Sequence, residues 1–178
     1  IGFNLQSNVP AESINKESRL HATNHHMRGL TNPDVHVLTV EDIEWLEIHF
    51  ENARKLLDIE QYITAIHCLA SYRWHSMPRI QMAILWAGIE GIFGASSEIR
   101  FRISLYIARF LYPNDPDARK KTFDSVKKLY NTRSASVHGS KIKSDIQTAV
   151  MESADILCEV LKKCTINNSL PNEIDLIP

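Results

Sequence analysis

Residues 79–94 read RIQMAILWAGIEGIFG, and this stretch decides the fold. Apolar side chains occur on every side of a helix drawn through it, and Glu90 is its one carboxylate. A helix that is apolar all round is buried on all sides, so we place it at the centre of a helical bundle. Pro78 suits its first turn. Gly88 and Gly91 lower helix propensity, so we expect them where neighbouring helices approach closely.

Helical periodicity continues on both sides of this stretch. The expected helices span about residues 39–57, 60–74, 79–94, 97–112, 117–132 and 140–164. One apolar face of the first helix is formed by Ile43, Leu46, Phe50, Ala53 and Leu57. No strand-like alternation competes, so the sequence predicts an all-α bundle of about five to six helices.

The helical pattern does not extend to the ends of the chain. Residues 1–38 are polar and irregular, and we expect an N-terminal arm or linker there. Residues 39–164 form the predicted helical domain, and residues 165–178 the C-terminal tail. The chain begins Ile1-Gly2 rather than with Met, as expected for the C-terminal piece of a longer protein.

Composition and motifs indicate where the protein is located and whether it binds a membrane, a cofactor or a metal. Three cysteines without a CxxC pair, all at apolar helical positions, predict a reduced cytoplasmic protein with buried thiols. No apolar run approaches a membrane span and no signal peptide is visible, so we expect no membrane partner. No glycine-rich phosphate loop indicates a cofactor. His21, His25, His26 and His36 could bind a metal, but no carboxylate or cysteine pattern completes a site, so none is predicted.

A second stretch, residues 130–139, reads YNTRSASVHG and carries the candidate chemistry. The planar guanidinium of Arg133 can hold a phosphate, and His138 can take or give a proton near neutral pH. Such a pair is a minimal set for cleaving RNA without a metal. Arg19 precedes His25 and His26 at similar spacings, but it lies in a polar stretch with no helical period, so we set it aside.

Geometry limits how this pair can cooperate. In a continuous helix, residues five apart point about 140° away from each other. Cooperation in one protomer needs a break, for which Ser134 and Ser136 are plausible caps. The other solution is a dimer whose two-fold axis brings two copies of the turn together. The structural alternative is that Arg133 pairs with a helix end or an acid, while His138 caps or packs.

Four segments resemble, in order and spacing, the Apea-like branch of the HEPN domains. They are residues 86–93, residues 97–99, residues 129–130, and the R-x4-6-H motif from Arg133 to Gly139. The resemblance covers about residues 40–164. Many HEPN proteins have Asn, Asp or His directly after the arginine, whereas Ser134 here fits the Apea-like branch.

The resemblance implies a function as well as a fold. It implies a homodimeric, metal-independent endoribonuclease with its composite site across the dimer. In it, an RNA 2′-hydroxyl attacks the neighbouring phosphate with help from His138 and Arg133. It also implies a role in prokaryotic defence or toxin-type growth arrest, with a fused or separate regulatory domain.

Glu90 is the second residue of interest, because a carboxylate on an apolar helix is costly unless it is paired. The resemblance implies a polar residue here that faces the Arg-His turn, so we expect Glu90 to orient Arg133 or His138. The alternative is a buried structural ion pair with Arg102 or Arg109.

The charge pattern adds candidate substrate contacts. Between Arg119 and Lys143 there are eight Lys or Arg against one acid, Asp124, although the net charge of the chain is only −1. This run either steers RNA or forms a solvated helix face. The candidate RNA-contacting residues are Lys127, Lys128, Asn131, Ser134 and Lys141. The rival functions are a non-catalytic module that dimerises or binds RNA, and a HEPN enzyme held inactive by a partner.

Overall fold

A computed structural model of the chain describes residues 5–7, 9–18, 20–22, 38–95, 97–142 and 145–177. The chain divides into two compact units, residues 1–37 and residues 38–178. In the first unit, strands β1 (Leu5–Ser7) and β2 (Leu20–Ala22) form an antiparallel pair. The sequence predicted only irregular structure there. Strands of three residues are too short for an alternating pattern to appear in the sequence.

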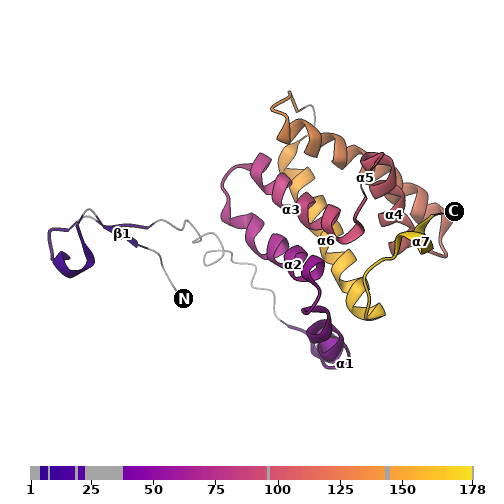
Figure 1. The fold of residues 1–178 in the computed structure, drawn as a ribbon, viewed down its shortest axis with the longest axis horizontal. Helices are drawn as coiled ribbons and strands as arrows, with labels where there is room; N and C mark the ends of the chain where they lie inside the picture. The colour runs from indigo at the N-terminus through magenta and orange to yellow at the C-terminus, as the bar shows by residue number, and fades with distance from the viewer. Residues whose placement is uncertain are drawn as a thin grey trace. The chain divides into compact units, whose positions relative to one another are not determined.

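The second unit is all-α, as predicted (Figure 1). Its helices are α1 (Val40–Leu56), α2 (Glu60–Ser71) with the 3-10 turn η3 (Tyr72–Trp74), α3 (Pro78–Phe93), α4 (Ile99–Leu111), α5 (Pro116–Val137), α6 (Ile146–Asn167) and α7 (Glu173–Leu176). Thr39 begins α1 with a capping box, because its hydroxyl accepts from the Asp42 amide while the Asp42 carboxylate accepts from the Thr39 amide. None of the described helices combines the length and hydropathy that a membrane span requires.

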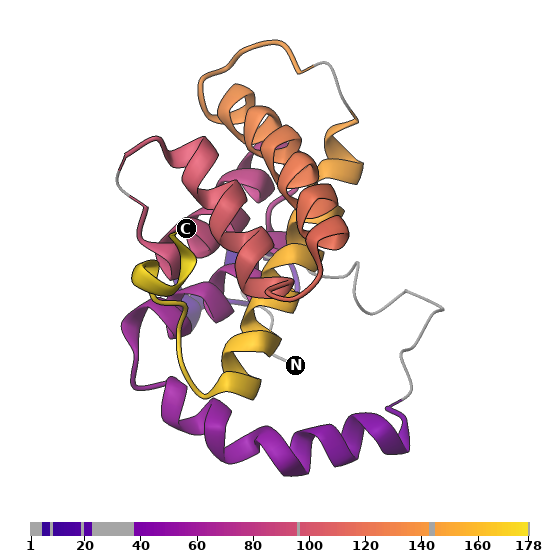
Figure 2. The same ribbon diagram turned by 90° about the vertical axis from the view of Figure 1, so that its right-hand side faces the viewer.

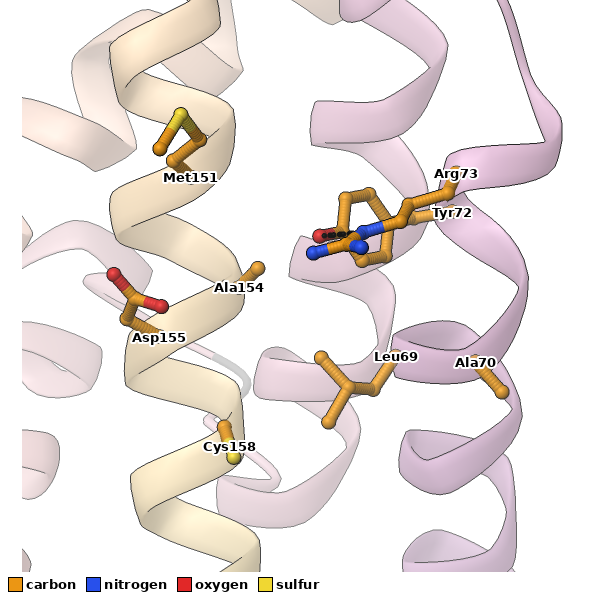
Figure 3. A pocket seen from close by; sticks show the side chains of 8 residues that line it. All are labelled: Leu69, Ala70, Tyr72, Arg73, Met151, Ala154, Asp155 and Cys158. Atoms are coloured by element: carbon orange, nitrogen blue, oxygen red, sulfur yellow. Dashed lines mark hydrogen bonds between the residues drawn. The ribbon is translucent and has the colours of Figure 1, made fainter. Parts of the chain in front are cut away.

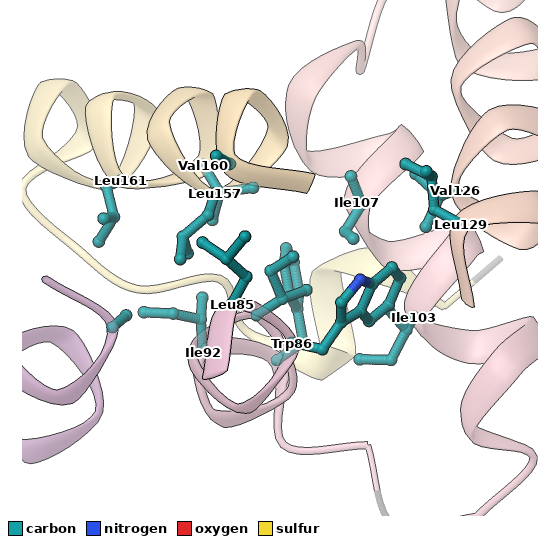
Figure 4. Packing of buried hydrophobic residues seen from close by; sticks show 14 of the residues in the cluster. Leu85, Trp86, Ile92, Ile103, Ile107, Val126, Leu129, Leu157, Val160 and Leu161 are labelled. Carbon is teal, nitrogen blue, oxygen red and sulfur yellow. The ribbon is translucent and has the colours of Figure 1, made fainter. Parts of the chain in front are cut away.

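The central position predicted for α3 is confirmed. It packs against α2, α5 and α6, and Met82, Leu85, Trp86 and Ile89 are fully buried. Figure 4 shows Leu85 and Trp86 among side chains from α4, α5 and α6. The Trp86 indole N–H donates to the buried Ser153 hydroxyl over 3.1 Å, so the one polar atom of this ring is satisfied.

The two glycines of α3 differ in their surroundings. A Cβ added at Gly88 would lie 3.0 Å from the Cys68 Cβ and 3.3 Å from the Ala65 Cα, so α2 approaches α3 closely at this point. At Gly91 an added Cβ would meet no atom of the described residues within 4 Å. The expected close approach is therefore confirmed for Gly88 and wrong for Gly91.

Helix α5 is five residues longer at its C-terminal end than the expected 117–132. It runs through Ser134 and Ser136, and the Ser136 hydroxyl donates back to the Thr132 carbonyl within the helix over 2.8 Å instead of capping a new helix. Arg79 of α3 holds the end of α5 from outside, since its guanidinium donates to the carbonyls of Ala135 (2.9 Å) and Ser136 (3.3 Å).

The segment expected as a C-terminal tail contains the short helix α7, which docks on α4. The Glu173 carboxylate accepts hydrogen bonds from Arg102 (2.8 Å) and from the Tyr106 hydroxyl (2.6 Å). Arg109 donates to the Leu176 carbonyl over 3.0 Å, and the Leu176 side chain is buried. Arg102 and Arg109 of α4 are thereby engaged with α7.

Candidate functional site

Arg133 lies on the side of α5 that faces α3. Its Nη2 atom is 2.9 Å from the Oε2 atom of Glu90, and the two side chains are only 21% and 24% exposed. The Arg133 guanidinium carbon also lies 5.6 Å from the centre of the Tyr130 ring, one turn earlier on α5. A carboxylate and an aromatic ring therefore fix the guanidinium between two helices.

This ion pair does not satisfy all of its polar atoms. The Oε1 atom of Glu90 and the Nε atom of Arg133 are buried, and neither has a hydrogen-bond partner among the described residues. Burial raises the pKa of Glu90 above the ordinary glutamate range, and the positive charge of Arg133 opposes this rise without cancelling it. The alternative partners considered for Glu90, Arg102 and Arg109, lie on α4 and bond to α7 instead.

His138 is exposed at the C-terminal end of α5, and its backbone N–H still donates to the Ser134 carbonyl over 3.0 Å. The helix is therefore unbroken between Arg133 and His138, and the break at Ser134 or Ser136 that cooperation within one protomer would need is absent from this described segment. Five residues of continuous helix separate the two side chains by about 140° around the axis. In one protomer, Arg133 faces α3 while His138 belongs to another side of α5.

The unbroken helix brings several other candidates onto one side. Lys127, Asn131, Ser134 and His138 follow the spacing i, i+4, i+7 and i+11, which defines one stripe of a helix. The Lys127 ammonium lies 5.7 Å from the centre of the Phe123 ring, one turn before it. Lys128 and Lys141 are exposed but lie off this stripe, since Lys128 is a quarter-turn away and Lys141 follows the helix.

A cavity of about 530 Å³ adjoins this region between α5 and the start of α4. Its lining residues are Ser97, Glu98, Ile99, Arg100, Phe101 and Tyr130. Most of this cavity is open to solvent, so it is a shallow depression in the surface rather than an enclosed site. Tyr130 therefore contacts the Arg133 guanidinium while it also lines the cavity.

Arg100 and Phe101 are site residues that the sequence did not indicate. Arg100 lines the cavity and donates to the Asn131 side-chain oxygen over 3.3 Å. Phe101 is 52% exposed and packs edge-on against Phe123, with ring centres 5.7 Å apart. Neither residue lies in a recognisable motif, and only the packing of α4 on α5 brings Arg100 beside Asn131 and Phe101 beside Phe123.

Arg79 is the third residue that sequence reasoning missed. Besides the two carbonyls at the end of α5, its guanidinium donates to the Ser140 carbonyl over 2.8 Å. These hydrogen bonds tie the first turn of α3 to both sides of the turn that carries His138 and Gly139. Gly139 has a φ of +70°, a left-handed conformation that glycine adopts without strain.

A different cavity of about 430 Å³ lies between α2 and α6 (Figure 3). Arg73 lies beside the Tyr72 ring and donates to the Tyr72 hydroxyl over 2.8 Å, while Asp155 and Cys158 line the α6 wall. None of the candidate residues lines this cavity, so the proposed chemistry does not involve it.

Within the part of the chain that the structure describes, no three His, Cys, Asp or Glu side chains group as metal ligands. His25, His26 and His36 lie outside the described residues, as does the side chain of His21. No family model matches this chain, and neither a curated protein nor a solved structure matches it.

Proposed function

We propose that this chain is a HEPN-like, metal-independent endoribonuclease that works as a homodimer. The observation that carries the proposal is the setting of Arg133. It is held by Glu90 and Tyr130 beside a shallow, open cavity, on the same helix whose end presents the exposed His138. Arginine and histidine are the residue types that phosphate stabilisation and proton transfer at RNA require.

The proposed reaction is cleavage by the RNA's own 2′-hydroxyl. His138 takes the proton as this oxygen attacks the adjacent phosphorus, and the bond from phosphorus to the 5′-oxygen breaks. A histidine returns a proton to the leaving 5′-oxygen, which gives a 2′,3′-cyclic phosphate and a 5′-hydroxyl. Arg133 stabilises the additional negative charge on the phosphorane-like transition state. DNA lacks the attacking hydroxyl and stays intact.

A dimer would bring an arginine and a histidine to the same phosphate, which one protomer does not do. Because the unbroken α5 directs Arg133 and His138 about 140° apart, a single chain does not point both at one phosphate. A two-fold axis near the end of α5 would place His138 of one protomer opposite Arg133 of the other. The activity then depends on protein concentration and on residues from both chains.

The RNA would run along the α5 stripe. Lys127 and Asn131 would contact its backbone, and Ser134 lies between them and His138 on the stripe. The cavity beside Tyr130 would hold one nucleotide, with Arg100 and Phe101 supplying a cation and an exposed ring. Single-stranded RNA is commonly bound by such a combination of stacking and positive charge. Lys128 and Lys141 would add only longer-range attraction.

The biological role follows the family resemblance. We propose prokaryotic defence or a toxin-type system, in which cleavage of cellular RNA stops growth. A fused or separate regulatory domain would hold the enzyme inactive until it is triggered.

The decisive experiment is cleavage of a labelled single-stranded RNA in EDTA by the parent, Arg133→Ala and His138→Ala. Cutting by the parent alone, with cyclic-phosphate ends, supports the assigned roles. Lys121→Ala, which removes an exposed cation from the same helix, is the matched control and should cut normally. An equimolar mixture of the two inactive variants should regain part of the activity, because a mixed dimer combines one intact Arg133 with one intact His138. Equal cutting by all variants would show that Arg133 and His138 are not catalytic.

The second candidate is a non-catalytic module that dimerises or binds RNA. The ion pair favours it, because Glu90 engages the guanidinium that a phosphate would need. RNA binding without cleavage, lost on Lys127→Ala but kept in Arg133→Ala, would support this candidate.

A further inference from the structure

Helix α1 attaches to the bundle through a narrow stripe of side chains that includes polar residues. Leu56 is buried, and the Asn52 amide donates to the Thr165 carbonyl of α6 over 3.2 Å. Trp45 and His49, half-buried on the same side, pack ring against ring at 4.8 Å. These four residues follow the spacing i, i+4, i+7 and i+11, so they form one side of the helix.

A second apolar stripe of α1 lies beside the first, and none of the described residues covers it. We call it the α1 seam, and its residues are Ile43, Leu46, Phe50, Ala53 and Leu57. Its four large side chains are 47%, 47%, 61% and 44% exposed, in chain order. This is the apolar face that the sequence marked on the first helix. It is therefore not the face that α1 turns to the core.

The seam has the geometry of a coiled-coil interface. Its residues follow the spacing 3, 4, 3, 4, so they correspond to the a and d positions of consecutive heptads. Apolar side chains at these positions pack efficiently against another helix with the same repeat. A continuous exposed apolar stripe of this kind marks an interaction surface rather than an ordinary solvated face.

We propose that the α1 seam pairs with the α1 seam of a second copy of this chain, in antiparallel orientation. In that register Phe50 lies opposite Ala53 of the partner subunit, and Leu46 lies opposite Leu57 of the partner subunit. A large side chain thus meets a small one in the central layers and leucines meet in the outer ones. The two-fold symmetry repeats each layer.

Charges beside the seam select this partner and this orientation. Glu47 and Arg54 are exposed and occupy equivalent heptad positions, seven residues apart. Antiparallel pairing places each Glu47 near Arg54 of the partner subunit, which gives two attractive contacts. Parallel pairing would instead place Asp42 near Glu47 of the partner subunit, with both groups negative.

Pairing through α1 requires Arg54 to leave its contact with Glu51, and this change costs little free energy. Arg54 already contacts Glu51 over 3.0 Å, but both side chains are more than 60% exposed. Such a solvent-exposed ion pair contributes at most about 1 kcal/mol, so Arg54 is available to a better-placed carboxylate.

This surface is distinct from the candidate catalytic site. In Figures 1 and 2, α1 lies at the bottom of the helical unit and the C-terminal end of α5 lies at the top. Pairing through α1 therefore adds to pairing at the His138 turn and does not depend on the proposed function.

Sedimentation analysis of the whole chain over a range of concentrations tests the proposal. Glu47→Arg and Arg54→Glu should each weaken the association through α1 on the order of tenfold, because like charges then face each other. The double variant, which exchanges the two charges, should restore it. Glu44→Arg makes the same charge change on the polar side of α1 and should have no effect.

Three results would overturn the proposal. One is a parent chain that remains monomeric at every concentration, as expected if the seam is covered by another part of its own chain. Another is a response to Glu47→Arg that matches the response to Glu44→Arg. The last is stronger association of Glu47→Arg, which is the behaviour of a parallel pair relieved of the Asp42 repulsion.

Discussion

Arg133 and Glu90 form an ion pair across α5 and α3, with Nη2 and Oε2 2.9 Å apart, and in the described part of the chain each side chain keeps one buried polar atom unpaired. An unsatisfied buried donor costs about 1–3 kcal/mol. Because the Nε atom of Arg133 is buried, a phosphate oxygen could reach it only after the side chain moves. The role that we propose for Arg133 in binding substrate therefore does not rest on this atom.

Replacing Glu90 by Gln should change how stability depends on pH. Because burial raises the pKa of Glu90, the folded chain keeps this proton to a higher pH than the unfolded chain does. The free energy of unfolding of the parent should therefore fall, relative to Glu90→Gln, as pH rises from the ordinary glutamate pKa through the raised value. Above that range the difference should be constant. Urea unfolding of both proteins measures it, and a parent that gains stability relative to Glu90→Gln over this range would show that folding lowers the pKa of Glu90.

Removing the guanidinium of Arg79 should loosen the turn that carries His138. Arg79→Ala leaves three carbonyls without this donor, and we expect a loss of about 1–3 kcal/mol in the free energy of unfolding. RNA cleavage should fall further than stability alone explains, because the position of His138 becomes less defined. Urea unfolding and cleavage rates on the same samples test this, with Lys121→Ala as the control. Unchanged cleavage by a folded Arg79→Ala protein would show that the turn is positioned by other contacts.

The two glycines of α3 should respond in opposite directions to the same substitution. Gly88→Ala forces a methyl group against Cys68 and the α2 backbone, so we expect a loss of about 1–3 kcal/mol. Gly91→Ala adds a methyl group in open space and should stabilise the helix by roughly 0.5–1 kcal/mol. Thermal or urea unfolding compares them directly. Each variant serves as the control for the other, and equal effects would contradict the packing of α2 on α3.

Cys164 should be the last of the three thiols to react. It is fully buried, and burial raises the pKa of its thiol to about 12, so almost no thiolate is present at neutral pH. Cys158 is partly exposed at the cavity between α2 and α6. Timed alkylation followed by mass spectrometry should label Cys158 first and Cys164 only on unfolding. Labelling of both at one rate in the native protein would refute this order.

The sequence predicted the centre of the fold because the signal there is local. An all-round apolar stretch with Pro78 at its start can only be a buried helix, and Trp86 and its neighbours are indeed fully buried. The end of α5 was harder to predict, since the residue that holds it, Arg79, comes 56 residues earlier than Ala135. No local pattern around Ser134 and Ser136 reveals a donor on another helix.

Helix α1 shows a different limit of predicting structure from sequence. Its seam is more regular and more apolar than the stripe that packs on α6, which contains His49 and Asn52. The periodicity of apolar residues therefore identified the seam, although the side of α1 that packs on α6 is the one with His49 and Asn52.

The candidate site was accessible from the sequence only in part. The position of Arg133 and His138 between predicted helices and their HEPN-like context singled out this pair, and the cost of a lone carboxylate drew attention to Glu90. Arg100 and Phe101 carry no signal of their own, because their relevance comes from the packing of α4 on α5.

The contacts of Arg79 also bear on the order in which the chain acquires its structure. The last turn of α5 is completed by a group from the first turn of α3, so it cannot reach its final form until those two helices have docked. Protection of the amides near His138 against hydrogen exchange would then report tertiary assembly rather than local helix formation. The turn that we assign to chemistry would be among the last parts of the bundle to become rigid.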